Sequence, residues 1–253
     1  KQMRRKVHYV IQPAHLWSSV ANMARTQDGE LLNTLQAGFR YIETESFEST
    51  FQGLFSEIDL SSPKLGKTYA DRNAKLCAII QKIAEGLAEF STDIDALGDA
   101  YEYLIGQFAA GSGKKAGEFY TPRAITAFMA DRVNPRLDSR ETVMDPACGT
   151  GGFLTAAIDH FRNQLTTKSS AEDKRAIEDL IHGIEKKQLP HLLCTTNMLL
   201  HGIDVPSQIE HKNTLGIGWN EWSANKKVDC IITNPPFGGY EDDGVGSDYP
   251  ADL

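Results

Sequence analysis

The chain has 253 residues, of which 41% are hydrophobic and 24% charged, enough for one large domain or two modest ones. Its formal net charge of −8 argues against a protein that grips nucleic acid by a strongly basic surface of its own. No apolar run approaches the roughly 20 residues that span a bilayer, and the basic residues 1–6 lead into no signal-peptide core. We therefore expect a cytoplasmic protein.

The first hundred or so residues have a helical pattern. Apolar residues recur at three- and four-residue spacing in residues 31–35 and 76–84, and residues 61–66 have the composition of a loop. The sequence predicts an all-α domain over residues 1–110.

A glycine-rich, basic segment at residues 109–117 is the best linker candidate. Before it, cap-type residues at 92–95 predict the start of a helix that carries Tyr101 and Tyr103, which we expect in core or interdomain packing. A second domain is then expected over residues 111–253. At its start, Thr121 and Pro122 suit the N-cap and the first position of a helix.

A glycine-rich loop at residues 145–153 follows the short apolar stretch 142–144 and precedes a helix-like run at 153–161. A strand, glycine turn and helix in this order bring a ligand against backbone amides at a helix N-terminus. The spacing G-x-G-G behind an acidic residue disfavours a nicotinamide or flavin site, which prefers G-x-G-x-x-G. The candidate ligand-binding residues of the loop are Asp145, Gly149, Thr150, Gly151 and Gly152.

A second buried strand is predicted at residues 180–185, ending in Glu185. In this fold class, a carboxylate at that place accepts hydrogen bonds from ribose hydroxyls. The polar insertion at residues 166–175 explains the long separation of Glu185 from the glycine-rich loop. A helix over 189–202 and a third strand over 208–211 follow.

The apolar run 228–233 predicts a further strand, which is followed by Asn234, Pro235, Pro236 and Phe237. A tight turn closed by prolines would explain these four residues without a function. Alternatively, the Asn234 side-chain oxygen and the Pro235 carbonyl could accept hydrogen bonds from a planar amine, favouring a pyramidal, reactive nitrogen. Phe237 could then stack on the planar ring that carries this amine.

No metal or disulfide framework is expected. Neither the cysteines nor the histidines show ligand spacing, and no C-x-x-C pair occurs. Cys148 lies inside the glycine-rich loop, where packing is a better explanation than a nucleophilic role, because no matched histidine is evident.

The two motifs, in this order, resemble those of the amino-group DNA methyltransferases, which share a D/E-P-x-x-G-x-G loop for S-adenosylmethionine and a D/N/S-P-P-Y/F tetrad for the base. Residues 95–104 and 117–123 narrow the resemblance to the modification subunit of type I restriction-modification systems, which methylates adenine at N6. The similarity covers nearly the whole chain.

The resemblance implies an α/β fold, a doubly wound Rossmann-like methyltransferase sheet preceded by the helical domain. It implies direct methyl transfer from S-adenosylmethionine to N6 of an adenine flipped from double-stranded DNA. It also adds candidate cofactor-binding residues, namely Glu118, Phe119, Tyr120, Thr121, Pro122, Arg123 and Asn213.

The resemblance further implies partners: a specificity subunit that reads the DNA sequence, two modification subunits for each specificity subunit, and in some assemblies a restriction nuclease. The recognised DNA sequence should reside in the partner. The net negative charge of the chain agrees with DNA contacts that are made largely by that partner.

Two rival hypotheses stay open at this point. One is a methyltransferase acting on cytosine N4 or on a glutamine side chain, which use similar tetrads; the other is a non-catalytic module that binds the cofactor only to regulate assembly. Because the chain stops at Leu253, shortly after the tetrad, we expect a sheet truncated at its C-terminal side and a segment inactive on DNA by itself.

Overall fold

The computed structural model describes residues 11–46, 51–89, 94–111, 120–203, 206, 208–222, 227–238, 241, 243–247 and 249. The chain divides into two compact units, Lys1–Leu97 and Gly98–Leu253. Within the described part of the chain, no helix is both long and apolar enough to cross a membrane.

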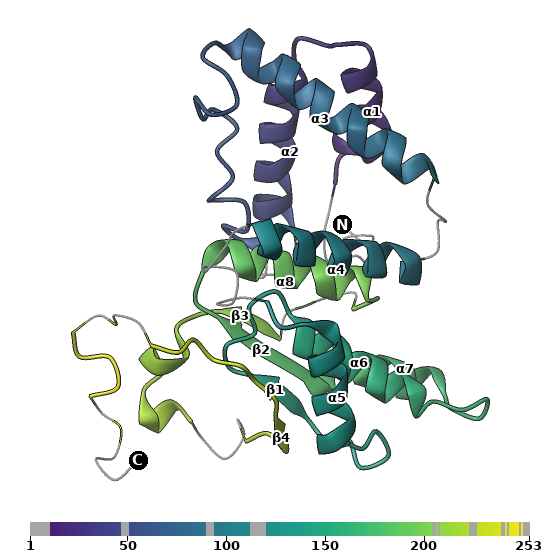
Figure 1. Ribbon diagram of the computed structural model, residues 1–253, viewed down its shortest axis with the longest axis vertical. Coiled ribbons are helices and arrows are strands. Elements are labelled where there is room, and N and C mark those ends of the chain that lie inside the picture. Colours follow the sequence, from purple (N-terminus) through teal and green to yellow (C-terminus); the bar gives the residue numbers. More distant parts are fainter. Residues whose placement is uncertain are drawn as a thin grey trace. The chain divides into compact units, whose positions relative to one another are not determined.

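The first unit is helical, as its spacing of apolar residues predicts. Its helices are η2 (Pro13–His15), α1 (Trp17–Arg25), α2 (Leu31–Glu45) and α3 (Tyr69–Glu89) (Figure 1). Their apolar faces enclose a core that consists of Val20, Ala24, Leu31, Leu32, Leu60, Leu76, Cys77 and Ile80.

One buried polar side chain joins these helices. Asn73 of α3 is only 5% exposed, accepts a hydrogen bond from the Leu32 amide at 2.9 Å and donates one to the Asp28 carbonyl at 2.8 Å. It thereby satisfies an amide at the start of α2 that has no partner within its own helix.

The second unit contains a parallel sheet and the helices around it (Figure 1). Its helices are α4 (Ile94–Gly111), which crosses the division between the units, α5 (Arg123–Val133), α6 (Gly152–Asn163), α7 (Ala171–Leu180) and α8 (Gln188–Leu200), with short turns η5 (Thr214–Gly216) and η6 (Trp219–Glu221). Its strands are β1 (Val143–Asp145), β2 (Ile181–Glu185), β3 (Ile209–His211) and β4 (Cys230–Ile231).

The strand order is β3-β2-β1-β4, with all neighbours parallel. Val143 of β1 pairs with Ile181 on one side and Cys230 on the other. The chain therefore runs outward from β1 to β3 and then returns to the other side of β1. This reversal creates a switch point beside the carboxyl end of β1, where ligands bind in doubly wound sheets.

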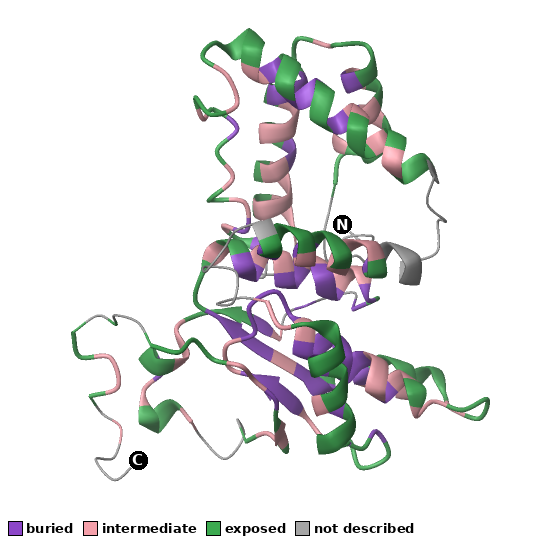
Figure 2. Ribbon diagram, viewed as in Figure 1, coloured by how far each residue is buried: buried purple, intermediate pink, exposed green. Residues whose placement is uncertain are grey.

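The two faces of the sheet are covered differently, because successive strand residues point to opposite faces. Val143 and Ile181 belong to the main core, which is closed mainly by α6 and α8. Met144 and Ile184, on the opposite face, belong to a much smaller cluster with Ile217. Figure 2 shows β1 and β2 as mostly buried strands.

Three local predictions need correction. The polar insertion contains the first half of helix α7, which begins with a capping box in which Ser170 and Asp173 exchange hydrogen bonds. Residues 109–111 of the predicted linker belong to α4. Pro122 is the N-cap of α5 rather than its first residue, and Thr121 does not cap this helix.

The predicted domain boundary at residues 110 and 111 stays a prediction. The two compact units meet at Leu97 and Gly98, because most of α4 packs with the second unit. For example, the Tyr101 hydroxyl donates to the Leu193 carbonyl of α8 at 3.3 Å. Tyr103, expected in packing, is 66% exposed.

The packing of α8 on the sheet can be tested with two truncations on that helix. Met198 is fully buried in the main core, whereas Leu189 is 39% exposed. We expect Met198→Ala to lower the free energy of unfolding by about 2–5 kcal/mol, and Leu189→Ala to change it by about 0.5 kcal/mol or less. Urea unfolding measures both; equal effects would contradict this packing.

Candidate functional site

The glycine loop, residues 145–153, is held to the carboxyl end of β2 by two hydrogen bonds. The Cys148 amide donates to the Ile184 carbonyl at 3.0 Å, and the Gly149 amide donates to the Glu185 carboxylate at 2.9 Å. The other oxygen of Glu185 accepts from the Lys187 amide at 2.7 Å. The strand-end carboxylate therefore orders both the loop and the start of α8.

Glycine is required at two turns of this loop. Gly149 and Gly151 have φ angles of 55° and 86°, in the left-handed region that other residues rarely adopt. A Cβ added at Gly151 would also lie 2.8 Å from the Cys194 sulfur and 3.1 Å from the Met198 methyl carbon. The close approach of α8 and the sharp turn both exclude a side chain here.

Asp145, the last residue of β1, is 1% exposed. Its carboxylate accepts a hydrogen bond from the Ala147 amide at 3.0 Å, which braces the turn into the glycine loop. Burial raises the pKa of Asp145 to about 6, because the charged form loses solvation. This group is therefore poised to change its charge near neutral pH.

The tetrad, residues 234–237, comes within hydrogen-bonding distance of the segment before α5. The Asn234 amide nitrogen donates to the Thr121 hydroxyl at 3.3 Å, linking segments that lie 113 residues apart. Asn234, Thr121 and Tyr120 line a narrow cavity of about 20 Å³ together with Asp145 and residues of the glycine loop. The fold thus brings three separate sequence motifs to one place.

The rest of the tetrad faces outward. Pro235 and Pro236 are exposed, and Phe237 is 95% exposed. The preceding strand β4 forms an edge of the described sheet, and its Ile231 is 59% exposed. A planar group could therefore reach Phe237 without displacing other described side chains.

The segment 118–123 is only partly covered by the structure, since Glu118 and Phe119 lie outside the described residues. Pro122 is exposed. Arg123 makes ion pairs with Asp99 at 2.5 Å and with Asp159 at 3.6 Å, in addition to a contact with Glu102. Neither Arg123 nor these carboxylates line the narrow cavity.

Asn213 follows β3 and caps the short turn η5, since its side-chain oxygen accepts from the Leu215 amide at 3.1 Å. Its amide nitrogen donates to Glu241 at 2.7 Å, and the same carboxylate pairs with Lys186 at 2.7 Å. Glu241 thus connects the segment after the tetrad to the ends of β2 and β3. Sequence reasoning did not single it out, because no spacing marks a contact so distant in the chain.

A buried side-chain amide also supports the glycine loop. Asn197 of α8 is 1% exposed and donates to the Thr150 carbonyl at 3.1 Å. Within a helix-like apolar run, nothing in the sequence distinguishes this asparagine from a surface residue. Across the described residues, no group of three or more acidic, histidine or cysteine side chains could hold a metal ion.

The sequence was compared with families of known proteins. The profile of the family described as N-6 DNA Methylase matches residues 92–249. The chain belongs to this family. A second profile, described as the HsdM N-terminal domain, matches residues 1–83, which precede the part matched by the N-6 DNA methylase profile.

Individual relatives agree with this membership. The methylase subunit of the type I restriction enzyme EcoEI from Escherichia coli is 48% identical over 185 residues, which cover 73% of this chain and 36% of the relative. The MpnII methylase subunit from Mycoplasma pneumoniae is 32% identical over 247 residues, covering 90% of this chain and 43% of that protein.

A solved structure shares the fold. The crystal structure of the type I restriction-modification methyltransferase subunit from Streptococcus thermophilus matches 93% of this chain and 47% of that chain, with a TM-score of 0.72 and 30% identity. The predicted methyltransferase fold is thereby confirmed. The chain spans less than half the length of these three relatives.

The anchoring of the glycine loop by Glu185 can be tested without any ligand. Glu185→Ala leaves two backbone amides without their acceptor, so we expect the free energy of unfolding to fall by about 1–3 kcal/mol. Glu185→Gln keeps one acceptor oxygen of the same shape and should lose less. Urea unfolding of both variants is the measurement, and an unchanged Glu185→Ala would contradict this role.

Proposed function

We propose that this chain is the cofactor-binding and base-binding part of a type I modification subunit, which transfers a methyl group from S-adenosylmethionine to adenine N6 in DNA. The observation that carries the proposal is the convergence of Thr121, the glycine loop and Asn234 on one cavity at the switch point of the sheet. Family membership supports adenine N6 over the cytosine N4 and glutamine alternatives.

The donor set suits S-adenosylmethionine. The glycine loop offers backbone amides at the N-terminus of α6, and Glu185 keeps free lone pairs for ribose hydroxyls after accepting one bond on each oxygen. When bound, this cofactor supplies an activated methyl group on a sulfonium. Because the cavity is narrow, binding would widen the gap between Thr121 and Asn234.

The tetrad would hold the base. The Asn234 oxygen and the Pro235 carbonyl would accept hydrogen bonds from the exocyclic amine, and the exposed Phe237 ring would stack on the flipped adenine. These groups orient and desolvate the amine, and the thioether that leaves requires no acid. Asn213 is proposed as a further polar contact near the adenine end of the cofactor.

We propose that most contacts to DNA come from a specificity subunit. Two modification subunits would assemble with each specificity subunit. The net charge of −8 supports this assignment, since a protein that binds DNA alone usually presents an excess of basic side chains.

Asn234→Ala should impair methyl transfer without impairing cofactor binding. We expect methyl transfer in the complex with a specificity subunit and target DNA to fall roughly a hundredfold or more, because an acceptor aimed at the reacting amine is lost. Calorimetric binding of S-adenosylmethionine should be retained. Asn163→Ala, at an exposed position at the end of α6, is the matched control and should leave both unchanged. Loss of binding together with transfer would count against this role of Asn234.

Cofactor affinity should depend on the ionisation of Asp145. With the pKa of Asp145 raised to about 6 by burial, the carboxyl is protonated below that pH and charged above it. Since the carboxylate attracts the sulfonium cation, the Kd for S-adenosylmethionine should rise as pH falls through about 6 and stay level above about 7. Calorimetry across pH tests this, and Asp145→Asn should flatten the profile. A wild-type profile that is already flat would contradict it.

A further inference from the structure

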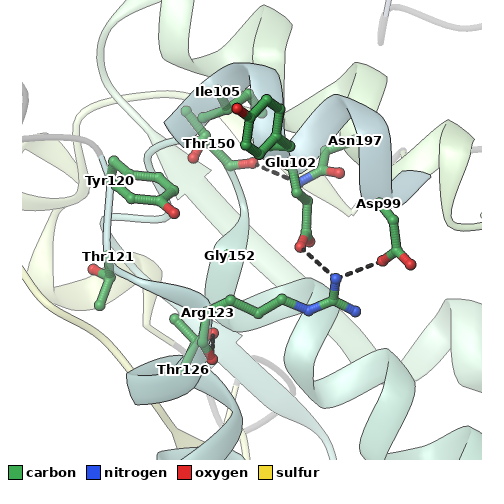
Figure 3. A pocket seen from close by; sticks show the side chains of 11 residues that line it. Asp99, Glu102, Ile105, Tyr120, Thr121, Arg123, Thr126, Thr150, Gly152 and Asn197 are labelled. Carbon is green, nitrogen blue, oxygen red and sulfur yellow. Dashed lines mark hydrogen bonds and ion pairs between the residues drawn. The ribbon is translucent and has the colours of Figure 1, made fainter. Parts of the chain in front are cut away.

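A second cavity, of about 230 Å³, lies beside the glycine loop (Figure 3). It shares Tyr120, Thr121, Thr150 and Gly152 with the narrow cavity, so a ligand lying along the loop could reach both. Its remaining lining comes from α4, α5 and α8, namely Asp99, Glu102, Tyr103, Ile105, Arg123, Thr126 and Asn197. Most of this wall comes from residues 95–104 and 117–123, the segments that carried the resemblance, but neither Asp99 nor Glu102 was assigned a ligand from the sequence.

The wall contributed by α4 carries an excess of negative charge. Arg123 faces Asp99 at 2.5 Å and Glu102 at 3.4 Å, and Figure 3 shows its guanidinium between these two side chains. Its third partner, Asp159 at 3.6 Å, is not part of the cavity lining. One guanidinium thus meets three carboxylates, which leaves the region suited to a further cation.

Glu102 is the best placed of these carboxylates to receive that cation. Its side chain is 14% exposed, whereas those of Asp99 and Asp159 are 61% and 42% exposed. A weakly solvated carboxylate interacts more strongly with a bound charge than an exposed one does. Behind it, His201 lies 3.6 Å from the other Glu102 oxygen and helps to fix the side chain in place.

The opposite wall of the cavity suits a ligand that carries a negatively charged group and a hydrogen-bond donor. Gly152 begins α6, a helix of 12 residues whose first amides have no acceptor within the helix and carry a partial positive charge. Asn197, only 1% exposed, also lines the cavity, and its side-chain oxygen has no hydrogen-bond partner among the described residues. A buried acceptor without a donor is unusual and indicates a missing polar ligand.

We infer that this cavity takes the α-amino acid end of the cofactor, with Glu102 accepting its ammonium group and the N-terminus of α6 facing its carboxylate. Arg123 is then a positioning residue that holds Glu102. The inference deepens the proposed function and depends on it, because it names residues for one part of the same cofactor. The apolar side chain of Ile105 suits the methylene groups between the two charged ends.

Two natural adenosine thioethers can be used to test whether Glu102 binds the amino acid end of the cofactor or only supports the fold. S-adenosylhomocysteine carries the amino acid end, whereas 5′-methylthioadenosine has the same adenosine and a neutral sulfur but lacks that end. Calorimetry on the purified subunit should show that Glu102→Gln weakens S-adenosylhomocysteine about tenfold or more, because a charged hydrogen bond is lost. Binding of 5′-methylthioadenosine should change less than about twofold.

Asp159→Asn is the matched control, since it removes another partner of Arg123 without touching the cavity. It should leave both ligands unaffected. Urea unfolding of Glu102→Gln checks that the fold is intact, and Glu102→Asp, which keeps the charge, should restore part of the affinity for S-adenosylhomocysteine.

The outcomes separate a failure of the proposed function from a failure of the role of Glu102. If neither ligand binds the folded wild type, the proposed function itself fails. If Glu102→Gln weakens both ligands equally, or if Asp145→Asn rather than Glu102→Gln weakens S-adenosylhomocysteine selectively, cofactor binding stands but the role of Glu102 is overturned.

Discussion

The carboxyl end of β2 determines the shape of the site, because it supplies the acceptors on which the glycine loop is built. The Ile184 carbonyl and the Glu185 carboxylate receive the amides of Cys148 and Gly149, so two strands that are neighbours in the sheet jointly order one turn. The amides that follow, at the start of α6, have no acceptor within their own helix. A carboxylate that holds the loop while retaining free lone pairs can support the fold and receive a ligand.

The residues around this turn divide into a preorganised part and an open part. Gly151 is packed so closely against α8 that a methyl group would clash, and Asn197 holds the Thr150 carbonyl from the same helix. The tetrad, in contrast, is joined to the segment before α5 by a hydrogen bond from Asn234 to Thr121 and leaves Phe237 exposed. Under the proposed function, the closely packed side would hold the cofactor and the accessible side would receive the DNA base.

Carboxylates outnumber basic groups around Arg123 in the second unit. Arg123, which lines the cavity beside the loop, is engaged by three carboxylates, and Asp145 is buried at the end of β1. Under the proposed function, these groups serve a positively charged cofactor, while phosphate contacts come from elsewhere in a complex. On the second face of the sheet, the hydrophobic cluster of the described residues is small, with Met144, Ile184 and Ile217 as its buried members.

Local sequence patterns determined much of this protein. Apolar spacing predicted the helices of the first unit, and the strand, glycine loop and helix around Asp145 have the predicted order, since these elements depend on contacts between near neighbours in the chain. Glu185 was identified for the same reason, as the polar end of a buried strand. Helix α7 was missed because its surface is almost wholly polar and its start depends on a capping box.

Only the tertiary structure decided which side chains meet across long separations. The contact of Thr121 with Asn234, the bridge from Glu241 to Asn213 and the placement of Glu102 beside Arg123 all join segments whose spacing carries no periodic signal. It also turned Arg123 from a residue of a recognised motif into the centre of an ion-pair network. Such contacts depend on how elements pack, and packing is set by the whole core rather than by the residues near each side chain.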